Sequence, residues 1–195
     1  MSRRNTPYKK IVLLLVSGLL VLAGYLFKDV LNPRLDSGKE ANRASAFGDN
    51  YDYNDILVKR VVDGDTLLLE NRRYVRLLGI DTPEIHESAK LYRDARRSGQ
   101  SVEAIKQDGK LAYEFVKQLV EGKRVRLEFD WERYDKYNRI LAYVFLEDGT
   151  LLNARIVEAG YASLTSFRIN PTYADLFAKL YRQAREDKRG LWGKD

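Results

Sequence analysis

The sequence predicts an α+β domain that is mainly β, a small barrel of five short strands with packed helices, preceded by a transmembrane helix. Three observations lead to this prediction. Short apolar, β-like runs bounded by turn residues recur from residue 55 onward. Segments with apolar residues at helical spacing follow the third run. An uncharged apolar stretch lies near the N-terminus.

The N-terminal segment has the pattern of a signal anchor. Residues 1–10 are polar and carry four cationic side chains, and residues 11–27 contain no charge. Such a helix spans roughly 25 Å, near the lower limit for crossing a bilayer. The preceding cations place the N-terminus in the cytoplasm. We therefore expect a basic cytoplasmic N-terminus over 1–10 and a transmembrane signal anchor over 11–27.

This topology puts the rest of the chain outside the cytoplasm, in the periplasm or at the cell exterior. A cleaved signal peptide, which would make the protein secreted, is the first alternative, and a buried core helix is the second. Ala44-Ser45-Ala46 is a small-x-small site, but it lies far beyond the apolar run.

One folded domain is expected over residues 55–195, after a polar linker over residues 28–54. The whole chain has 34 Lys and Arg residues and 28 Asp and Glu residues. From residue 55 onward there are 26 Lys and Arg and 23 Asp and Glu, which gives this part a net charge of about +3. This balance is compatible with a polyanionic substrate but does not require one. The chain has no cysteine and one histidine, His86, which excludes thiolate chemistry and argues against a Ser-His-Asp triad or a histidine-rich zinc site.

The strands are predicted from apolar runs between turn signals such as Asp63-Gly64, Asn71-Arg72 and Asp148-Gly149. They cover residues 56–62, 66–70, 74–80, 124–130 and 140–146.

Helices are predicted at residues 110–120 and 152–159, each followed by a glycine. A C-terminal helix is predicted to open at Asn170-Pro171, an N-cap and N1 pair, and to end before Gly190. The charged segment 85–109 is expected to be helical in part.

Acidic residues and Arg76 gather in the segments Val62–Thr66 and Arg76–Glu84, among residues typical of a β core. Carboxylates placed there are costly unless a cation meets them, and a hard divalent cation is the simplest partner. Each group also has a plain structural interpretation. Asp63-Gly64-Asp65 could be a hairpin turn, and Asp81-Thr82-Pro83-Glu84 could open a helix. Arg76 could form an ion pair with Asp65 or Asp81, Arg139 could be a surface turn residue, and His86 could face solvent.

Three motifs in order resemble the staphylococcal nuclease (thermonuclease) family, the SNase-like domain. They are Asp63-Gly64-Asp65-Thr66, the run from Arg76 to Glu84 (RLLGIDTPE) and the run from Asp135 to Tyr143 (DKYNRILAY). The ending Gly190-Leu191-Trp192 also resembles that family, so the resemblance covers about Ile56 to Trp192. It implies a five-stranded OB-fold barrel with packed helices and calcium-dependent hydrolysis of phosphodiester bonds in DNA and/or RNA.

The resemblance also implies residue roles. The Ca²⁺ ligands would be Asp65, Asp81 and the backbone carbonyl of Thr82. Arg76 and Arg139 would bind the phosphate, Glu84 would be the acid near the attacking water, and Asp63 would be an outer-shell carboxylate. The sequence departs from the family in a longer, differently charged segment 85–109, in Ser166-Phe167-Arg168 where relatives often carry tyrosines, and in Asn138 where a glycine is usual.

These residue types suit phosphodiester hydrolysis. A cation and two forked guanidinium groups offset the charge that grows on the phosphate, while Glu84 activates or orients water. The leading hypothesis is a membrane-tethered nuclease that acts on DNA and/or RNA, with no obligate protein partner evident. The alternatives are a catalytically silent OB-fold module that binds nucleic acid or protein, and a membrane-bound scaffold that uses segment 85–109.

Overall fold

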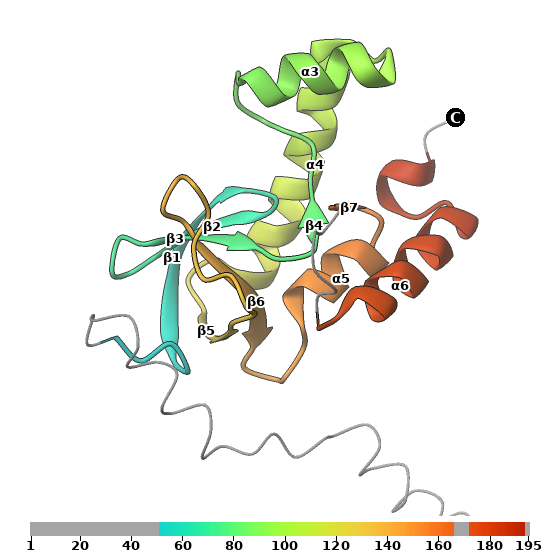
Figure 1. The fold of residues 1–195 in the computed structure, drawn as a ribbon. Coiled ribbons are helices and arrows are strands. Elements are labelled where there is room, and N and C mark those ends of the chain that lie inside the picture. Colours follow the sequence, from blue (N-terminus) through green and yellow to red (C-terminus); the bar gives the residue numbers. More distant parts are fainter. Residues whose placement is uncertain (1–50, 166–171, 194–195) are drawn as a thin grey trace, which may run out of the picture. The chain divides into compact units, whose positions relative to one another are not determined.

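Five strands close into a barrel in the computed structural model, which describes residues 51–165 and 172–193. The barrel order is β1-β2-β3-β6-β5, and every neighbouring pair is antiparallel except β3 and β6 (Figure 1). The strands are β1 (Ile56–Asp63), β2 (Thr66–Leu69), β3 (Tyr74–Leu77), β5 (Arg124–Glu128) and β6 (Ile140–Leu146). The predicted mixed fold with a closed five-stranded barrel is confirmed, and it fits an OB-fold.

Aliphatic side chains from each strand fill the barrel, because alternate residues of a strand point to the same face. Val58, Leu67, Val75, Leu127 and Val144 are all buried. Arg76 lies between the buried Val75 and Leu77 and is only half-buried. Its side chain is therefore on the outer face of the barrel wall.

The predicted third strand, residues 74–80, proves to be two strands. β3 ends at Leu77, Gly79 turns the backbone with φ of 87°, and β4 (Ile80–Asp81) pairs instead with β7 (Ser163–Leu164). Asn153 holds this bend: its Nδ2 donates to the carbonyl of Leu78 at 2.8 Å. The bend carries the residues after Gly79 away from the barrel wall.

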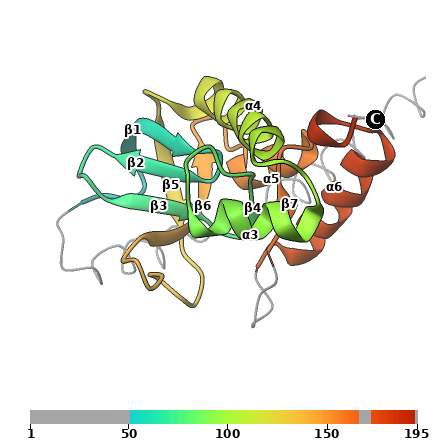
Figure 2. The ribbon, with the colours of Figure 1, turned by 90° about the horizontal axis from the view of Figure 1, so that it is seen from above.

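Four helices and one 3₁₀ turn complete the described part of the chain. They are α3 (Ala89–Ser98), α4 (Val102–Val120), α5 (Leu152–Glu158), α6 (Ala174–Glu186) and η2 (Gly190–Gly193). α4 packs on β1 and on α3, which lies at the N-terminal end of α4, away from the barrel (Figure 1). α5 packs between β6 and α6, so the helices cover one side of the barrel (Figure 2).

Several helix boundaries differ from the prediction. α4 begins at Val102 rather than at residue 110, with the Ser101 side chain accepting from the Ala104 amide at 3.1 Å. Segment 85–109, expected to be helical in part, contains α3 and the start of α4. Residues 82–88 are irregular, so Thr82-Pro83-Glu84 does not open a helix. The C-terminal helix begins at Ala174.

Other predicted features lie outside the described residues. They are the Asn170-Pro171 helix opening, the basic segment 1–10, the transmembrane segment 11–27 and nearly all of the linker 28–54. Within residues 51–165 and 172–193, no helix combines the length and the hydropathy that a membrane crossing requires.

The bend at Gly79 gives a test of what fixes the start of β4. In Gly79→Ala the alanine backbone would have to adopt a left-handed conformation, and its methyl group would overlap the buried ring of Phe177. Gly149 has a similar φ of 83° but open space around it, so Gly149→Ala is the matched control. We predict that Gly149→Ala lowers the free energy of unfolding by about 1–2 kcal/mol and that Gly79→Ala lowers it by roughly 2 kcal/mol more. Urea denaturation measures both, and equal losses would contradict the packing role.

Candidate functional site

Arg76 joins two acids that come from different parts of the sequence. Its Nη1 lies 2.8 Å from Asp65 Oδ2, and its Nη2 lies 2.7 Å from Asp81 Oδ1. The side chains of Arg76 and Asp65 are 15% and 8% exposed, so this pairing is largely shielded from water. The structure thus brings together three of the predicted site residues. The ion pair that the sequence allowed between Arg76 and either Asp65 or Asp81 forms with both acids.

Asp65 occupies the tight turn between β1 and β2, where Asp63 pairs with Thr66. Its Oδ1 accepts a hydrogen bond from Thr66 Oγ1 at 3.0 Å. Its Oδ2 accepts from the amide and the hydroxyl of Thr82, at 2.9 and 3.1 Å. These bonds fasten the β1–β2 turn to the segment that follows β4. The hairpin turn and the acidic site that the sequence offered as alternatives are therefore the same structure.

Lys90 is a second cation at this place, and sequence reasoning missed it. Its Nζ lies 3.3 Å from Asp81 Oδ2, 3.1 Å from Glu84 Oε1 and 3.2 Å from Asp94 Oδ2, and it donates to the carbonyl of Thr82 at 3.2 Å. Burial opposes its charge, but the carboxylates of Asp81 and Glu84 raise the pKa of Lys90 above its usual value. We refer to Asp65, Asp81 and Glu84 below as the acid cluster.

Glu84 is positioned by the close approach of α4. A side chain at Gly109 of α4 would meet the carbonyl of Pro83 at 2.7 Å and that of Glu84 at 2.8 Å, so only glycine permits this contact. The Glu84 carboxylate accepts from Ser88 Oγ at 3.4 Å and pairs with Lys90. A glycine inside an apolar helical pattern is the sequence signal for such an approach. Neighbouring His86 is exposed.

Two carboxyl groups at the site have altered acidity. Burial, with repulsion from Asp65 adding to it, raises the pKa of Asp63 to about 7. Burial also raises the pKa of Asp81, although the charges of Lys90 and Arg76 oppose the change. Asp63 accepts a hydrogen bond from the Gly64 amide at 2.8 Å and lies directly before the turn that carries Asp65. At a pH near 7, the Asp63 carboxyl is therefore about half protonated.

Arg139 directly precedes β6 and makes no hydrogen bond or ion pair with the acid cluster in the described part of the chain. β3 and β6 are parallel, with Val75 opposite Ile140, so Arg139 lies one residue before the position paired with Val75. Its Nε lies 2.7 Å from Asp135 Oδ2, and its amide donates to the other oxygen at 2.9 Å. Burial opposes the charge of Asp135, but these hydrogen bonds lower its pKa. Asn138 precedes it in the left-handed region at φ of 61°.

The oxygens that could hold a metal ion are two carboxylates and one carbonyl. Among the described residues, no three His, Cys, Asp or Glu side chains are placed to hold an ion by themselves. Oxygens of Asp81 and Thr82, two members of this set, together with Glu84 contact the Lys90 ammonium, so they already face a cation. Carboxylate and carbonyl oxygens are also the donors that calcium prefers. The residues present therefore fit a hard divalent ion in donor type.

Comparison with known proteins gives a consistent result. Residues 74–194 match the family model described as staphylococcal nuclease homologue. The chain is 34% identical to the thermonuclease of Staphylococcus intermedius over 139 residues, which are 70% of this chain and 74% of that protein. It is 30% identical to the thermonuclease of Staphylococcus hyicus over 138 residues, 69% and 73% of the two chains. It is 31% identical to the endonuclease YncB of Bacillus subtilis over 144 residues, 71% and 62% of the two chains.

The raised pKa of Asp63 predicts a specific pH dependence of stability. Between its unfolded value of 3.8 and its folded value of about 7, the folded state binds the extra proton. The free energy of unfolding therefore falls as the pH rises through this window. We predict that Asp63→Asn removes a loss on the order of 2–4 kcal/mol between pH 4.5 and pH 8, from the roughly 1.4 kcal/mol that each pKa unit represents.

Urea unfolding in the presence of a chelator measures this difference. Asp148→Asn is the matched control, because hydrogen bonding to Thr150 lowers the pKa of Asp148 and it does not titrate in this window. An Asp63→Asn profile parallel to that of the wild type would contradict the prediction.

Proposed function

Because the chain belongs to the staphylococcal nuclease family, we propose that it is a calcium-dependent nuclease that hydrolyses phosphodiester bonds in DNA and/or RNA. The main supporting observation is the pairing of Arg76 with both Asp65 and Asp81 at 2.7–2.8 Å, on the outer face of the barrel. An arginine and three acids within one cluster suit hydrolysis of a phosphate diester, because they can hold a cation, bind the phosphate and receive a proton.

The arginines bind the substrate in this proposal. A phosphodiester is anionic, and a planar guanidinium offers two parallel donors to two of its oxygens, which an ammonium group does not match in geometry. Arg76 lies on β3, Arg139 directly precedes the neighbouring strand β6, and both would contact the same phosphate. Asp135 holds Arg139 through its side chain and its amide, which limits the orientations available to the guanidinium.

Asp65, Asp81 and the carbonyl of Thr82 would hold the calcium ion. When bound, the ion supplies positive charge to a phosphoryl oxygen and offsets the charge that develops there. The chain keeps these oxygens in place through hydrogen bonds from Thr82 to Asp65 and from Ser163 Oγ to the carbonyl of Asp81, the latter at 3.2 Å. Asp63 is the outer acid of the set, one residue removed from Asp65 in the turn.

Glu84 is the acid that meets the attacking water. It is 20% exposed, so water reaches it, and α4 fixes its backbone at Gly109. Its carboxylate accepts the proton of the water or orients the water by hydrogen bonding. Lys90 and Ser88 hold this carboxylate, and hence its direction relative to the rest of the acid cluster.

We also propose that residues 11–27 anchor the protein in a membrane with the nuclease domain outside the cytoplasm. The support is the uncharged apolar run after four cations. Processing of this segment would release a secreted enzyme. Accessibility of the domain to protease added to spheroplasts tests the topology: protection in spheroplasts, with digestion after the membrane is lysed, would refute it.

One observation favours a second candidate, a catalytically silent OB-fold module. Lys90 already balances Asp81 and Glu84, so the acid cluster needs no external cation to be stable. The presence of Asp65, Arg76, Asp81, Glu84 and Arg139 together argues for the enzyme. The two candidates differ in whether purified protein releases nucleotides in a chelator-sensitive reaction.

The function is tested with plasmid DNA and with RNA, each with calcium or with a chelator. We predict hydrolysis that the chelator abolishes, and a 10²–10³-fold lower rate in Arg76→Lys, by analogy with the loss of one preorganised donor. Lysine keeps the charge against Asp65 and Asp81 but loses the fork, so the fold survives better than with alanine. Circular dichroism checks folding, and chelator-resistant activity in Arg76→Lys would overturn the assignment.

The position of Lys90 predicts that its charge weakens calcium binding. Its ammonium contacts oxygens of Asp81 and Thr82 that the ion would also use, so the two cations repel and compete. We predict that Lys90→Met lowers the calcium dissociation constant about tenfold, or about 1.4 kcal/mol, in a calorimetric titration without substrate. Lys106→Met is the control, because the ion pair of Lys106 in the described part of the chain is with exposed Glu87, at 3.9 Å. Unchanged or weaker calcium binding in Lys90→Met would contradict competition.

A further inference from the structure

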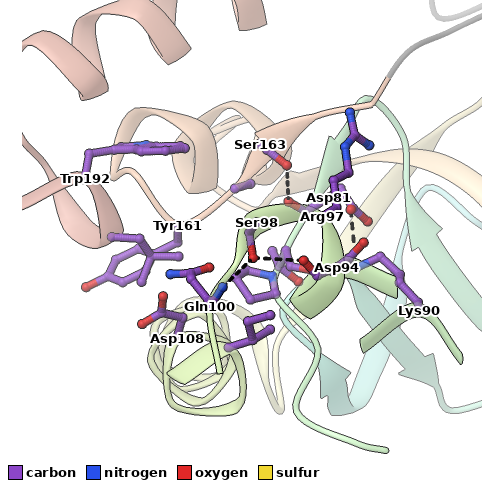
Figure 3. A pocket seen from close by; sticks show the side chains of 15 residues that line it. Asp81, Lys90, Asp94, Arg97, Ser98, Gln100, Asp108, Tyr161, Ser163 and Trp192 are labelled. Carbon is purple, nitrogen blue, oxygen red and sulfur yellow. Dashed lines mark hydrogen bonds and ion pairs between the residues drawn. The ribbon is translucent and has the colours of Figure 1, made fainter. Parts of the chain in front are cut away.

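We propose that a cavity beside the acid cluster is a second substrate-binding site, which takes the nucleotide next to the scissile phosphate in single-stranded DNA or RNA. The inference rests on the proposed function for the identity of the reacting phosphate. The cavity itself lies among α3, the start of α4 and the segments that carry Tyr161 and Trp192 (Figure 3).

The cavity is continuous with the proposed reaction site. Asp81, Thr82 and Lys90 line it and also belong to or contact the acid cluster. Its volume is about 470 Å³, within the range of small-molecule sites in proteins, roughly 300–1,000 Å³. A nucleic acid strand whose phosphate lies at Arg76 and Asp81 can therefore extend its neighbouring nucleotide into this space.

One face of α3 forms a charged wall, and the charged residues of the whole lining are the cations Lys90 and Arg97 and the acids Asp81, Asp94 and Asp108. Lys90, Asp94 and Arg97 are spaced by four and three residues, which places them on the same side of the helix, and all three line the cavity. Lys90 and Asp94 pair with each other at 3.2 Å. Arg97 is exposed and has no ion pair or hydrogen bond to any residue in the described ranges. It lies about 10 Å along the helix from Lys90, at a rise of about 1.5 Å per residue, and is a free guanidinium for the next phosphate.

Aromatic rings form the opposite end. Figure 3 shows Tyr161 and Trp192 on the side of the cavity away from Lys90. Tyr161 stacks on Phe115 with ring centroids 4.7 Å apart, and Trp192 meets the ring of Tyr181 edge-on at 5.4 Å. These contacts hold both rings in place. Stacking of a base on such a ring contributes about 1–3 kcal/mol and tolerates any base.

The remaining lining suits a nucleobase. Gln100 and Asp108 place amide and carboxylate groups in the cavity, and Ile105 and Pro83 add apolar surface. A base can enter such a space only when it is not stacked and paired inside a duplex. A guanidinium for a backbone phosphate, aromatic rings for a base and a few polar groups are features by which proteins bind single strands without reading their sequence. The cavity therefore favours an unpaired strand.

The binding test uses the full-length chain and a fluorescein-labelled decathymidylate in a chelator, where no hydrolysis takes place. Fluorescence anisotropy is expected to show about tenfold weaker binding for Arg97→Gln. Arg96→Gln is the matched control, since Arg96 is an exposed neighbour on α3 that does not line the cavity. It should change the affinity less than twofold. Equal losses in the two variants would show only diffuse attraction to α3 and would overturn the cavity proposal.

A steric variant tests the cavity without a change of charge. Ser98 is exposed and lines the cavity, so Ser98→Trp is expected to weaken decathymidylate binding about tenfold while Ser98→Ala leaves it unchanged. A blunt decamer duplex should bind both variants alike. Unchanged binding of the single strand to Ser98→Trp would refute the proposal.

Hydrolysis of bis(p-nitrophenyl) phosphate with calcium separates this inference from the proposed function. This substrate has no neighbouring nucleotide, so Arg97→Gln and Ser98→Trp should hydrolyse it at the wild-type rate. If the wild type is inactive on every phosphodiester but the binding differences persist, the nuclease proposal fails and the single-strand site stands. If the wild type is active but all variants bind the single strand equally, the nuclease proposal stands and the single-strand site fails.

Discussion

The bridge from Arg76 to Asp65 and Asp81 is the interaction on which the site depends. Asp65 belongs to the turn between β1 and β2, and Asp81 lies beyond the bend that ends β3. Two carboxylates this shielded from water would repel each other without the guanidinium between them. The bridge thus fixes the distance between the β1–β2 turn and β4, and the hydrogen bonds from Thr82 to Asp65 fix their relative orientation.

The same bridge links the chemistry of the two acids to that of the arginine. Arg76 can turn its donors toward a phosphate only when another cation balances Asp65 and Asp81, because an unpaired carboxylate in a shielded site is costly. Lys90 supplies part of this balance for Asp81, while Asp65 has only neutral donors besides Arg76 among the contacts in the described region. The demand for an added cation is therefore greatest at Asp65, which is the acid most deeply buried.

Much of the fold could be predicted because its signals are local. Turn residues bound the strands, and apolar periodicity marks the helices, so the barrel strands follow from the sequence. The approach of Asp65 to Asp81 is implied by the family resemblance and not by these local signals. The break at Gly79 could not be predicted, because Leu78 and Ile80 continue an apolar run and the contacts that bend it come from Asn153 and Phe177, far along the chain. The role of Lys90 could not be predicted for a similar reason: it lies in a charged segment without a pattern, and only the return of α3 across the site brings it to Asp81.

The positions of the cations suggest a path for the substrate across the site. Arg76 lies on β3 and Arg139 directly before the neighbouring strand β6, while Lys90, which contacts the acid cluster, and Arg97 lie on α3. The barrel thus supplies one half of the path and segment 85–109 the other. A phosphate chain laid along it would pass from the rigid β surface, over the acids, to the helix. The barrel half consists of paired strands, whereas the helical half is held at the site by Lys90 and by the contact of α4 at Gly109. Any difference in binding between single-stranded and double-stranded nucleic acid should therefore originate in the helical half.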